Sequence, residues 1–359
     1  MFYQMLTDIS WVVNLRSPIL TPIFEFLTWL GYRDFLFMFI PFTYWCFDRK
    51  IFGRLVLIVF FSAIINSWLK DFFQDPRPDL YLNIDPWLQT ETSFGFPSGH
   101  TQIAVVIWLY IALNVRNLFA KIVSIFFLLG VPFSRIYLGV HDIGDILGGM
   151  TVGLFTLYAA HLFYQNIDSG KYNFSNRLKY TSAIIALILF YFSWPMEHGY
   201  ALVAGLGGLI LGFMIGSDLD KRYFNYERVS NNFMHYLSCS LALIVFLVLN
   251  QFLETVFAQI ILPELFEISV SSFILGAYIS FIALFLLSKV KLQSIRKLSP
   301  CFKIKKSSFD ILDFFSSFNN SRGGSFTGSS VKMKVPHAIP IALLASRSRN
   351  VITASSGLM

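Results

Sequence analysis

Residues 51–78 read IFGRLVLIVFFSAIINSWLKDFFQDPRP, a long apolar run followed by charges and two prolines. About 20 apolar residues are enough for a helix to cross a bilayer, so 51–73 predicts a transmembrane span. Proline cannot continue a helix, so this span should end before the prolines. Lys70 and Arg77 then lie at a membrane boundary, where charge is unfavourable, so they either anchor the helix end or bind an anion.

The composition of the whole chain agrees with a membrane protein. Of its 359 residues, 55% are hydrophobic and only 14% are charged, whereas an ordinary soluble protein has roughly 25% charged residues. A soluble enzyme, a disordered chain, a coiled coil and a disulfide-rich secreted domain are therefore disfavoured. Cys46, Cys239 and Cys301 are far apart and lack metal-site spacing, so we expect lone residues and no disulfide framework.

Similar apolar runs recur along the chain and predict an all-α, polytopic membrane protein. The expected spans are 10–31, 33–48, 51–73, 98–115, 118–138, 143–164, 178–195, 199–217, 233–253 and 269–288. The first span is the least regular, because Arg16 and two prolines interrupt it, so part of it could lie at the membrane interface.

The basic residues predict the orientation of these spans. The formal net charge is +7. Alternate connections hold most of the basic residues: Arg49, Lys50 and Arg54; Arg116 and Lys121; Lys171, Arg177 and Lys179; Lys221, Arg222 and Arg228; and the tail from Lys289 onward. By the positive-inside rule these connections and both termini are cytoplasmic. The loops 74–97 and 139–142 then face the periplasm, exterior or an organelle lumen, and we favour a bacterial inner membrane over the endoplasmic reticulum. Nucleic acid is not an expected partner.

The sequence Phe96-Pro97-Ser98-Gly99-His100 stands at the predicted start of the fourth span. Free backbone amides at a helix N-terminus favour an anion, and Ser98 would point toward it. Gly99 lets a ligand approach the backbone closely. His100 could give or take a proton beside that anion, although a simple turn with a bystander histidine is the alternative.

A third cluster, Ser134-Arg135…His141…Asp145, lies between the fifth and sixth spans. His141 and Asp145 are four residues apart and would share a helix face. The aspartate could then hold one ring nitrogen protonated and leave the other as a nucleophile or base. Arg135, like Lys70 and Arg77, is an exception to the charge asymmetry. Three cations and a helix N-terminus match a phosphate group, unless His141 and Asp145 are only a surface pair.

The ordered set Lys70…Arg77-Pro78, Pro97-Ser98-Gly99-His100 and Ser134-Arg135…His141…Asp145 resembles the type 2 phosphatidic acid phosphatase superfamily, which includes lipid phosphate phosphatases and vanadium haloperoxidases. The resemblance implies a six-span catalytic core over 1–165. Residues 166–290 would add about four transmembrane helices, and 291–359 would form a basic, Ser/Gly-rich cytoplasmic tail that is flexible.

What the resemblance implies for chemistry is a two-step phosphoryl transfer. His141 would attack phosphorus and form a phosphohistidine, while Asp145 orients it and His100 protonates the leaving oxygen. The phosphate oxygens would be held by Lys70, Arg77, Ser98, Gly99 and Arg135. No cofactor or metal is expected, because these clusters lack a carboxylate set for Mg²⁺ or Zn²⁺.

The expected substrate is an amphiphilic phosphorylated lipid taken from the membrane. Undecaprenyl diphosphate, phosphatidic acid, phosphatidylglycerophosphate and a sphingoid-base phosphate are candidates. An aromatic rim fits such a substrate but is also typical of an interfacial belt: Phe72, Phe73, Tyr81, Trp87, Phe94 and Phe96. The first alternative is a phosphotransferase of the same fold that uses a lipid acceptor; a transporter or membrane scaffold is the second.

Two further patterns lie in the later part of the chain. Asp218 and Asp220 neighbour two basic residues and predict a charged cytoplasmic loop. Glycines recur at 205, 207, 208, 212 and 216 inside an apolar run. Small residues at such spacing predict close helix–helix packing within the membrane.

Overall fold

The computed structural model describes residues 6–88, 93–172, 175–197, 199–223, 225–226, 233–257, 259 and 263–294. These belong to the first of two units, Met1–Phe309. The second unit, Asp310–Met359, lies outside the described residues, as does most of the tail that we predicted to be flexible. The division of the chain at 165 and 290 stays a prediction.

Every regular element in the described part of the chain is helical, which confirms the predicted fold class. The first half contains η1 (Ser10–Leu15), α2 (Leu20–Trp29), α3 (Arg33–Cys46), α4 (Arg49–Phe73), η2 (Leu80–Leu82), α5 (Gly99–Ala104), η3 (Val105–Leu109), α6 (Tyr110–Asn114), α7 (Leu118–Tyr137) and α8 (Ile143–Asp168). The second half contains α9 (Asn176–Ser193), α10 (Gly199–Tyr223), α11 (Phe233–Phe257), α12 (Glu264–Ala277), η4 (Tyr278–Ile282) and α13 (Ala283–Ser294).

Among the residues that the structure describes, six helical stretches are long and apolar enough to cross a membrane: α4, α7, α8, α10, α11 and Glu264–Ser288. The chain is therefore an integral membrane protein. The first expected span, 10–31, is instead divided into η1 and α2. The backbone is extended at Arg16, and the proline at position 18 has no N–H with which to continue a helical hydrogen-bond ladder.

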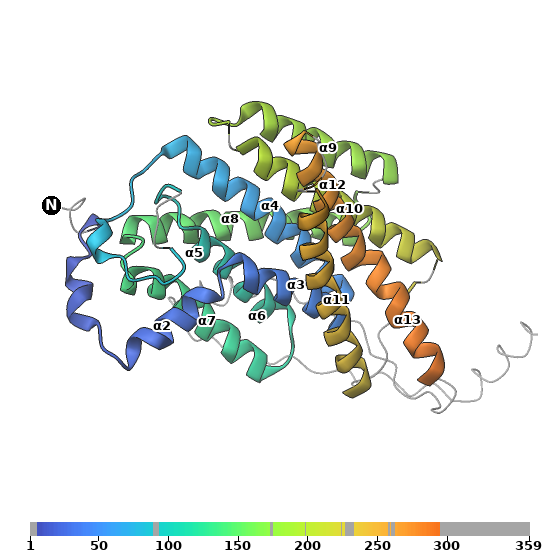
Figure 1. The fold of residues 1–359 in the computed structure, drawn as a ribbon, viewed down its shortest axis with the longest axis horizontal. Coiled ribbons are helices and arrows are strands. Elements are labelled where there is room, and N and C mark those ends of the chain that lie inside the picture. The colour runs from blue at the N-terminus through green and yellow to red at the C-terminus, as the bar shows by residue number, and fades with distance from the viewer. Residues whose placement is uncertain are drawn as a thin grey trace, which may run out of the picture. The chain divides into compact units, whose positions relative to one another are not determined.

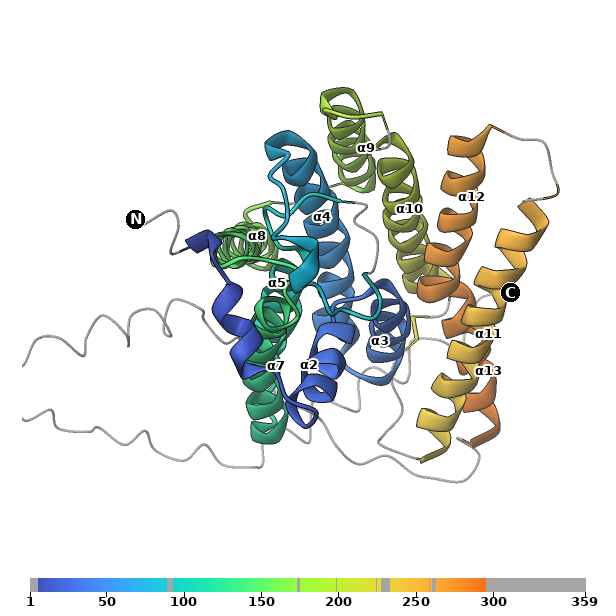
Figure 2. The same ribbon diagram turned by 60° about the vertical axis from the view of Figure 1, so that its left-hand side comes forward.

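Helix α4 packs against α3, α5, α8 and α10. It has α5 and α8 on one side and α9 and α10 on the other (Figure 1, Figure 2). Its N-terminus is capped by Asp48, whose carboxylate accepts hydrogen bonds from the backbone of Lys50 and Ile51. It ends at Phe73, where Gln74 adopts a left-handed conformation with φ of 50°. The helix thus ends before the prolines, as predicted.

The glycine pattern of α10 packs against α12, as the sequence predicted. A Cβ atom at Gly212 would lie 2.1 Å from the carbonyl oxygen of Phe273, and one at Gly208 would lie 2.4 Å from that of Ser269. Only glycine allows the two backbones to approach this closely.

Ion pairs join several helices at the end of the bundle where α4 begins. Arg54 of α4 pairs with Asp168 at the end of α8 at 2.7 Å. Lys179 of α9 pairs with Asp218 of α10 at 2.5 Å, and Arg49 pairs with Asp220 at 2.7 Å. We call this the basic end. The prediction of a charged loop at 218–220 was wrong, because both aspartates lie in α10 and Asp220 is fully buried.

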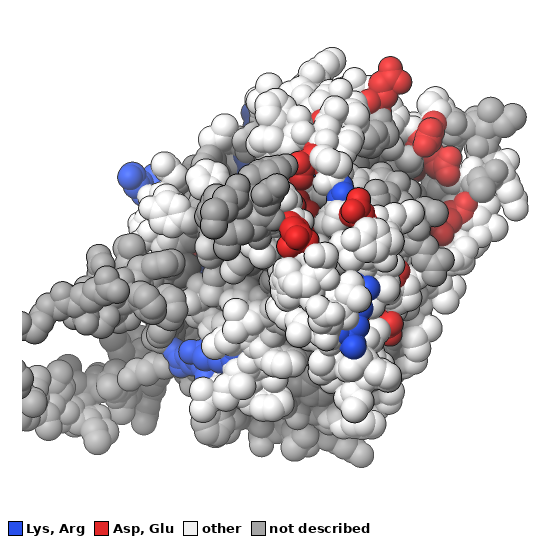
Figure 3. All heavy atoms as spheres, turned by 90° about the vertical axis from the view of Figure 1, so that its left-hand side faces the viewer, with Lys and Arg blue, Asp and Glu red and all other residues white. Residues whose placement is uncertain are grey.

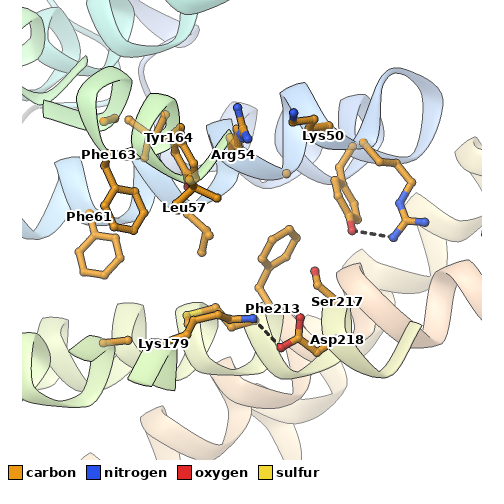
Figure 4. Close-up of a pocket in the computed structure, with 18 of the residues that line it drawn as sticks. Lys50, Arg54, Leu57, Phe61, Phe163, Tyr164, Lys179, Phe213, Ser217 and Asp218 are labelled. Atoms are coloured by element: carbon orange, nitrogen blue, oxygen red, sulfur yellow. Dashed lines mark hydrogen bonds and ion pairs between the residues drawn. The ribbon is translucent and has the colours of Figure 1, made fainter. Parts of the chain in front are cut away.

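A cavity of about 2100 Å³ opens at the basic end between α4, α8, α9 and α10. Figure 4 shows Arg54, Leu57 and Phe61 of α4 along one wall, opposite Phe213 and the Lys179–Asp218 pair. None of the predicted site residues lines it. They lie toward the other end of α4, a helix about 37 Å long at 1.5 Å per residue.

The buried Arg49–Asp220 pair should be a strong link between α4 and α10. Asp220→Ala leaves the mostly buried Arg49 guanidinium without its carboxylate, so we expect a loss of about 3–5 kcal/mol in unfolding free energy. Asp168→Ala is the control, because the carboxylate that it removes is 42% exposed and exposed pairs contribute about 1 kcal/mol at most. Thermal unfolding in detergent measures both, and equal losses would contradict the assignment.

Candidate active site

The three predicted clusters meet where α4 and α7 end and α5 and α8 begin. Arg77 Nη1 lies 3.3 Å from His141 Nε2, although the two residues are 64 positions apart. The backbone N–H of Ser98 donates to the carbonyl oxygen of Asp145 at 3.0 Å. Lys70 Nζ donates to the carbonyl oxygen of Gly95 at 2.9 Å, in the loop just before α5. The fold therefore gathers these residues into one site.

His141 and Asp145 form a buried pair at the start of α8. His141 Nδ1 lies 2.8 Å from Asp145 Oδ2, and each residue is 1% exposed. Asp142 caps the helix, because its carboxylate accepts from the backbone N–H of Asp145 at 2.8 Å while Asp145 Oδ2 accepts from that of Asp142. The helix cap thus positions the carboxylate that orients the imidazole.

The contact with Arg77 indicates which tautomer His141 adopts. A guanidinium has only donors, so Arg77 can bond His141 Nε2 only if that nitrogen carries a lone pair. The proton then lies on Nδ1, which donates to Asp145. Burial, reinforced by the positive charges of Lys70 and Arg77, lowers the pKa of His141 well below its ordinary 6.5. His141 is therefore neutral near pH 7, with Nε2 available as a nucleophile.

Lys70 and Arg77 also hold the loop before α5 in place. Lys70 donates to the backbone carbonyl of Phe94 as well as to that of Gly95. Arg77 donates through Nε to the carbonyl of Ser93 at 2.8 Å and through Nη2 to the Ser93 hydroxyl at 2.9 Å. Its Nη1 reaches the carbonyl of Val140, next to His141, at 2.9 Å. These cations thus connect the loop to the segment that carries His141.

Arg135 has a buried carboxylate partner that the sequence did not indicate. Its Nη1 donates to Asp85 Oδ2 at 2.5 Å and also contacts the hydroxyl of Thr28. Tyr32 donates to the same carboxylate oxygen at 2.7 Å, and burial raises the pKa of Tyr32 to about 12, so this phenol keeps its proton. Asp85 stands alone in a loop of the sequence, where an aspartate is usually solvated, so no local signal revealed it.

Removing the charge of Asp85 should weaken phosphate binding through Arg135. In Asp85→Asn the guanidinium loses its ionic partner and has only a neutral amide oxygen to hold it, so its position is less firmly fixed. A displacement of about 1 Å at a catalytic group can reduce the rate about a hundredfold. We expect a comparable fall in kcat/KM and a rise in the inhibition constant of inorganic phosphate. Tyr32→Phe, which removes one hydrogen bond from Asp85, should change kcat/KM about tenfold at most. An unchanged phosphate inhibition constant in Asp85→Asn would exclude this positioning role.

His100 lies at the start of α5, and its ring packs against Tyr32 and Gly31. It meets the ring of Tyr32 edge to face, with centroids 4.4 Å apart. It also packs on Gly31, where a Cβ atom would lie 2.3 Å from His100 Cδ2. Its Nε2 is buried and has no hydrogen-bond partner among the described residues. Arg135 Nε is likewise buried and has no hydrogen-bond partner among the described residues. Both atoms are therefore suited to bind a phosphorylated ligand.

Ser98 and Gly99 begin α5 next to this histidine. Ser98 is fully buried, and its hydroxyl accepts from Thr101 at 3.1 Å. A buried amide pair supports the turn from α4: Asn66 Nδ2 donates to the carbonyl of Pro97 at 3.2 Å and to Gln102 Oε1 at 2.8 Å. The amide pair was not predicted, because asparagine and glutamine carry no spacing signal of their own.

The surface around the site is aromatic. Phe72, Phe73, Tyr81 and Trp87 are each about half or more exposed, and Phe94 and Phe96 are partly buried. Phe73 and Phe96 are in edge-to-face contact, with centroids 5.0 Å apart. The end of the molecule to which α4 runs also displays several acidic side chains (Figure 3).

Comparisons with known proteins found similar sequences. The family model of the PAP2 superfamily matches residues 52–169, which include all eight predicted site residues. Sphingosine-1-phosphate phosphatase 2 from Mus musculus is 28% identical over 210 residues, covering 54% of this chain and 58% of that protein. Phosphatidylglycerophosphatase B from Bacillus subtilis is 30% identical over 168 residues, covering 43% of this chain and 80% of that protein.

A solved structure is also similar to part of the chain. The crystal structure of a transmembrane PAP2 type phosphatidylglycerolphosphate phosphatase from Bacillus subtilis is 30% identical, covering 44% of this chain and 83% of that one with a TM-score of 0.37. The chain spans only about half the length of the mouse and human sphingosine-1-phosphate phosphatases 2.

Proposed function

Because this chain belongs to the PAP2 superfamily, we propose that it is a membrane phosphohydrolase that removes phosphate from a lipid phosphate through a phosphohistidine. The observation that carries the proposal is the buried His141, with Nδ1 on Asp145 and Nε2 beside Arg77. An oriented neutral imidazole among fixed cations is suited to attack phosphorus. The relatives' names, sphingosine-1-phosphate phosphatase and phosphatidylglycerophosphatase, favour a lipid phosphate monoester.

The reaction would proceed in two displacements. His141 Nε2 forms a bond to phosphorus while the bond to the lipid oxygen breaks, and His100 supplies the proton that this oxygen takes. Water then attacks the phosphohistidine, His100 accepts its proton, and inorganic phosphate leaves with Nε2 free again. Lys70, Arg77 and Arg135, with Ser98 and the Gly99 amide, stabilise the charge on the phosphoryl oxygens. In this scheme no metal ion is used.

The arrangement of charges supports an orientation with the site outside the cytoplasm. Arg49, Lys50 and Arg54 begin α4, whereas Lys70 is near its other end. The positive-inside rule then places the basic end in the cytoplasm and the site at the periplasm, exterior or lumen. A bacterial inner membrane stays a prediction, since relatives come from both mouse and Bacillus subtilis.

A panel of lipid phosphates tests the function. Purified protein would be given sphingoid-base phosphate, phosphatidylglycerophosphate, phosphatidic acid and undecaprenyl diphosphate, each with wild type and His141→Ala. Release of inorganic phosphate by wild type alone supports the hydrolase. Transfer of label to an added lipid alcohol without phosphate release would favour the phosphotransferase, and no turnover with any substrate would reject the enzyme.

The pH dependence should report the lowered pKa of His141. Neutral His141 is the reactive form, so kcat/KM should fall only as pH drops through this lowered pKa, on a limb below pH 6.5. Burial and the nearby positive charges also lower the pKa of His100 well below 6.5. The alkaline limb of a bell-shaped profile should therefore come from His100 in kcat, because a bound phosphate dianion favours the protonated ring. Arg77→Gln removes a positive neighbour, so the acid limb should move to higher pH. Wild type and Arg77→Gln would be compared on the same substrate, so that ionisation of the substrate affects both profiles equally. An acid limb at the same pH in both proteins would contradict the assignment.

A further inference from the structure

Two cysteines and a histidine meet at a place far from the catalytic residues in sequence. Cys46 is the last residue of α3, and His235 and Cys239 lie in the first two turns of α11. All three are buried, and their ligand atoms lie within 4.8 Å of one another. Cys239 Sγ is 3.7 Å from His235 Nε2. Among the described residues this is the one group of histidine, cysteine and acidic side chains with such spacing.

The fold explains why the sequence did not reveal this group. His235 and Cys239 are four residues apart and share a face of α11. Helix α11 packs against α3, which supplies Cys46 from 189 positions earlier than His235 (Figure 1). The expectation of lone cysteines was therefore wrong for Cys46 and Cys239. Two of the three cysteines in the chain come together beside one of its six histidines.

We propose that Cys46, His235 and Cys239 bind one soft d¹⁰ metal ion, Zn²⁺ or Cu⁺, through two thiolates and one imidazole nitrogen. Thiolate and imidazole ligands suit these two ions. Zinc–ligand bonds of about 2.3 Å to sulfur and 2.0–2.1 Å to nitrogen imply ligand separations of about 3.5–3.8 Å in a tetrahedral site. The observed atoms need to close by about 1 Å at most. Three protein ligands leave a fourth position for water on zinc, whereas Cu⁺ is satisfied by three.

The charge balance also suits a buried site. Binding releases two thiol protons and forms two metal–sulfur bonds and one metal–nitrogen bond. Two thiolates with Zn²⁺ are neutral, so the occupied site places no net charge among the surrounding core residues. Because its ligands come from α3 and α11, the ion would hold the first helices of the chain to the later ones. None of the proposed catalytic residues is among its ligands, so the proposal stands apart from the proposed function.

Metal binding by the full-length protein in detergent tests the proposal. Stripped protein would be reloaded with Zn²⁺, Cu⁺ or the probe Co²⁺, and metal per chain measured by mass spectrometry. We expect one ion per chain in wild type and in Cys301→Ser, the matched cysteine control. Cys239→Ala and His235→Ala should bind at least tenfold more weakly. Comparing the metal content after loading with Zn²⁺ and after loading with Cu⁺ shows which of the two ions the site binds.

A second measurement needs no variant that removes a ligand. Co²⁺-loaded wild type should show a thiolate-to-cobalt charge-transfer band, and the metal should raise the unfolding temperature and protect Cys46 and Cys239 from alkylation. Absence of the cobalt band together with no binding of Cu⁺, equal metal content in Cys239→Ala and wild type, or a Cys46–Cys239 disulfide in the purified protein would each overturn the proposal.

Discussion

His141→Gln is expected to reduce lipid phosphate hydrolysis by at least about 10³-fold, which is typical when a catalytic nucleophile is removed. Glutamine preserves polarity and approximate size but has no nitrogen lone pair that can form a phosphohistidine. The structure supports this assignment because His141 Nε2 faces Arg77 while Nδ1 is held by Asp145. The loss should appear in kcat, measured as phosphate release at saturating substrate.

His161→Gln is the matched control for this variant. It changes a histidine within α8, the helix that begins two residues after His141, at a position outside the catalytic site. Its activity should stay within about threefold of wild type, since changes away from the site act mainly through stability. Radiolabel from the substrate phosphate should be trapped on wild type as an acid-labile adduct and be absent from His141→Gln. Substantial turnover by correctly folded His141→Gln would remove the proposed nucleophile.

Asp145→Asn is expected to reduce kcat by about 10⁴-fold, the loss seen when the carboxylate of a His–Asp pair becomes an amide. The asparagine has nearly the same shape but does not stabilise the imidazolium character that His141 gains as it attacks. Its NH₂ group can also face His141 Nδ1, which then carries no proton, so the proton moves to Nε2 and blocks attack. Kinetics with one saturating substrate measure the effect.

Asp142→Asn serves as the control for the charge of this carboxylate pair. Asp142 lies three residues before Asp145 and caps α8 by accepting from the backbone N–H of Asp145, and an asparagine oxygen can still accept this bond. Its kcat should change about tenfold at most. If the two variants lost activity equally, the aspartate would act through helix stability and not through the imidazole.

Local patterns in the sequence were sufficient for much of the fold. Apolar runs of membrane length predicted α4, α7 and α8 within a few residues of their observed bounds, because hydropathy is a property of each run by itself. The end of α4 followed from proline chemistry, and the contact of His141 with Asp145 from a spacing of four. Each of these signals acts within a turn or along one helix.

The tertiary structure alone decided which distant groups became partners. Arg135 meets Asp85 50 positions away, Arg49 meets Asp220 171 positions away, and Cys46 meets His235 and Cys239 across two helices. A polar residue in a loop or apolar run looks the same in sequence whether it is solvated or buried against a partner. The difference depends on which helix faces pack together, and that is set by the burial of side chains throughout the bundle, not by any neighbouring residue.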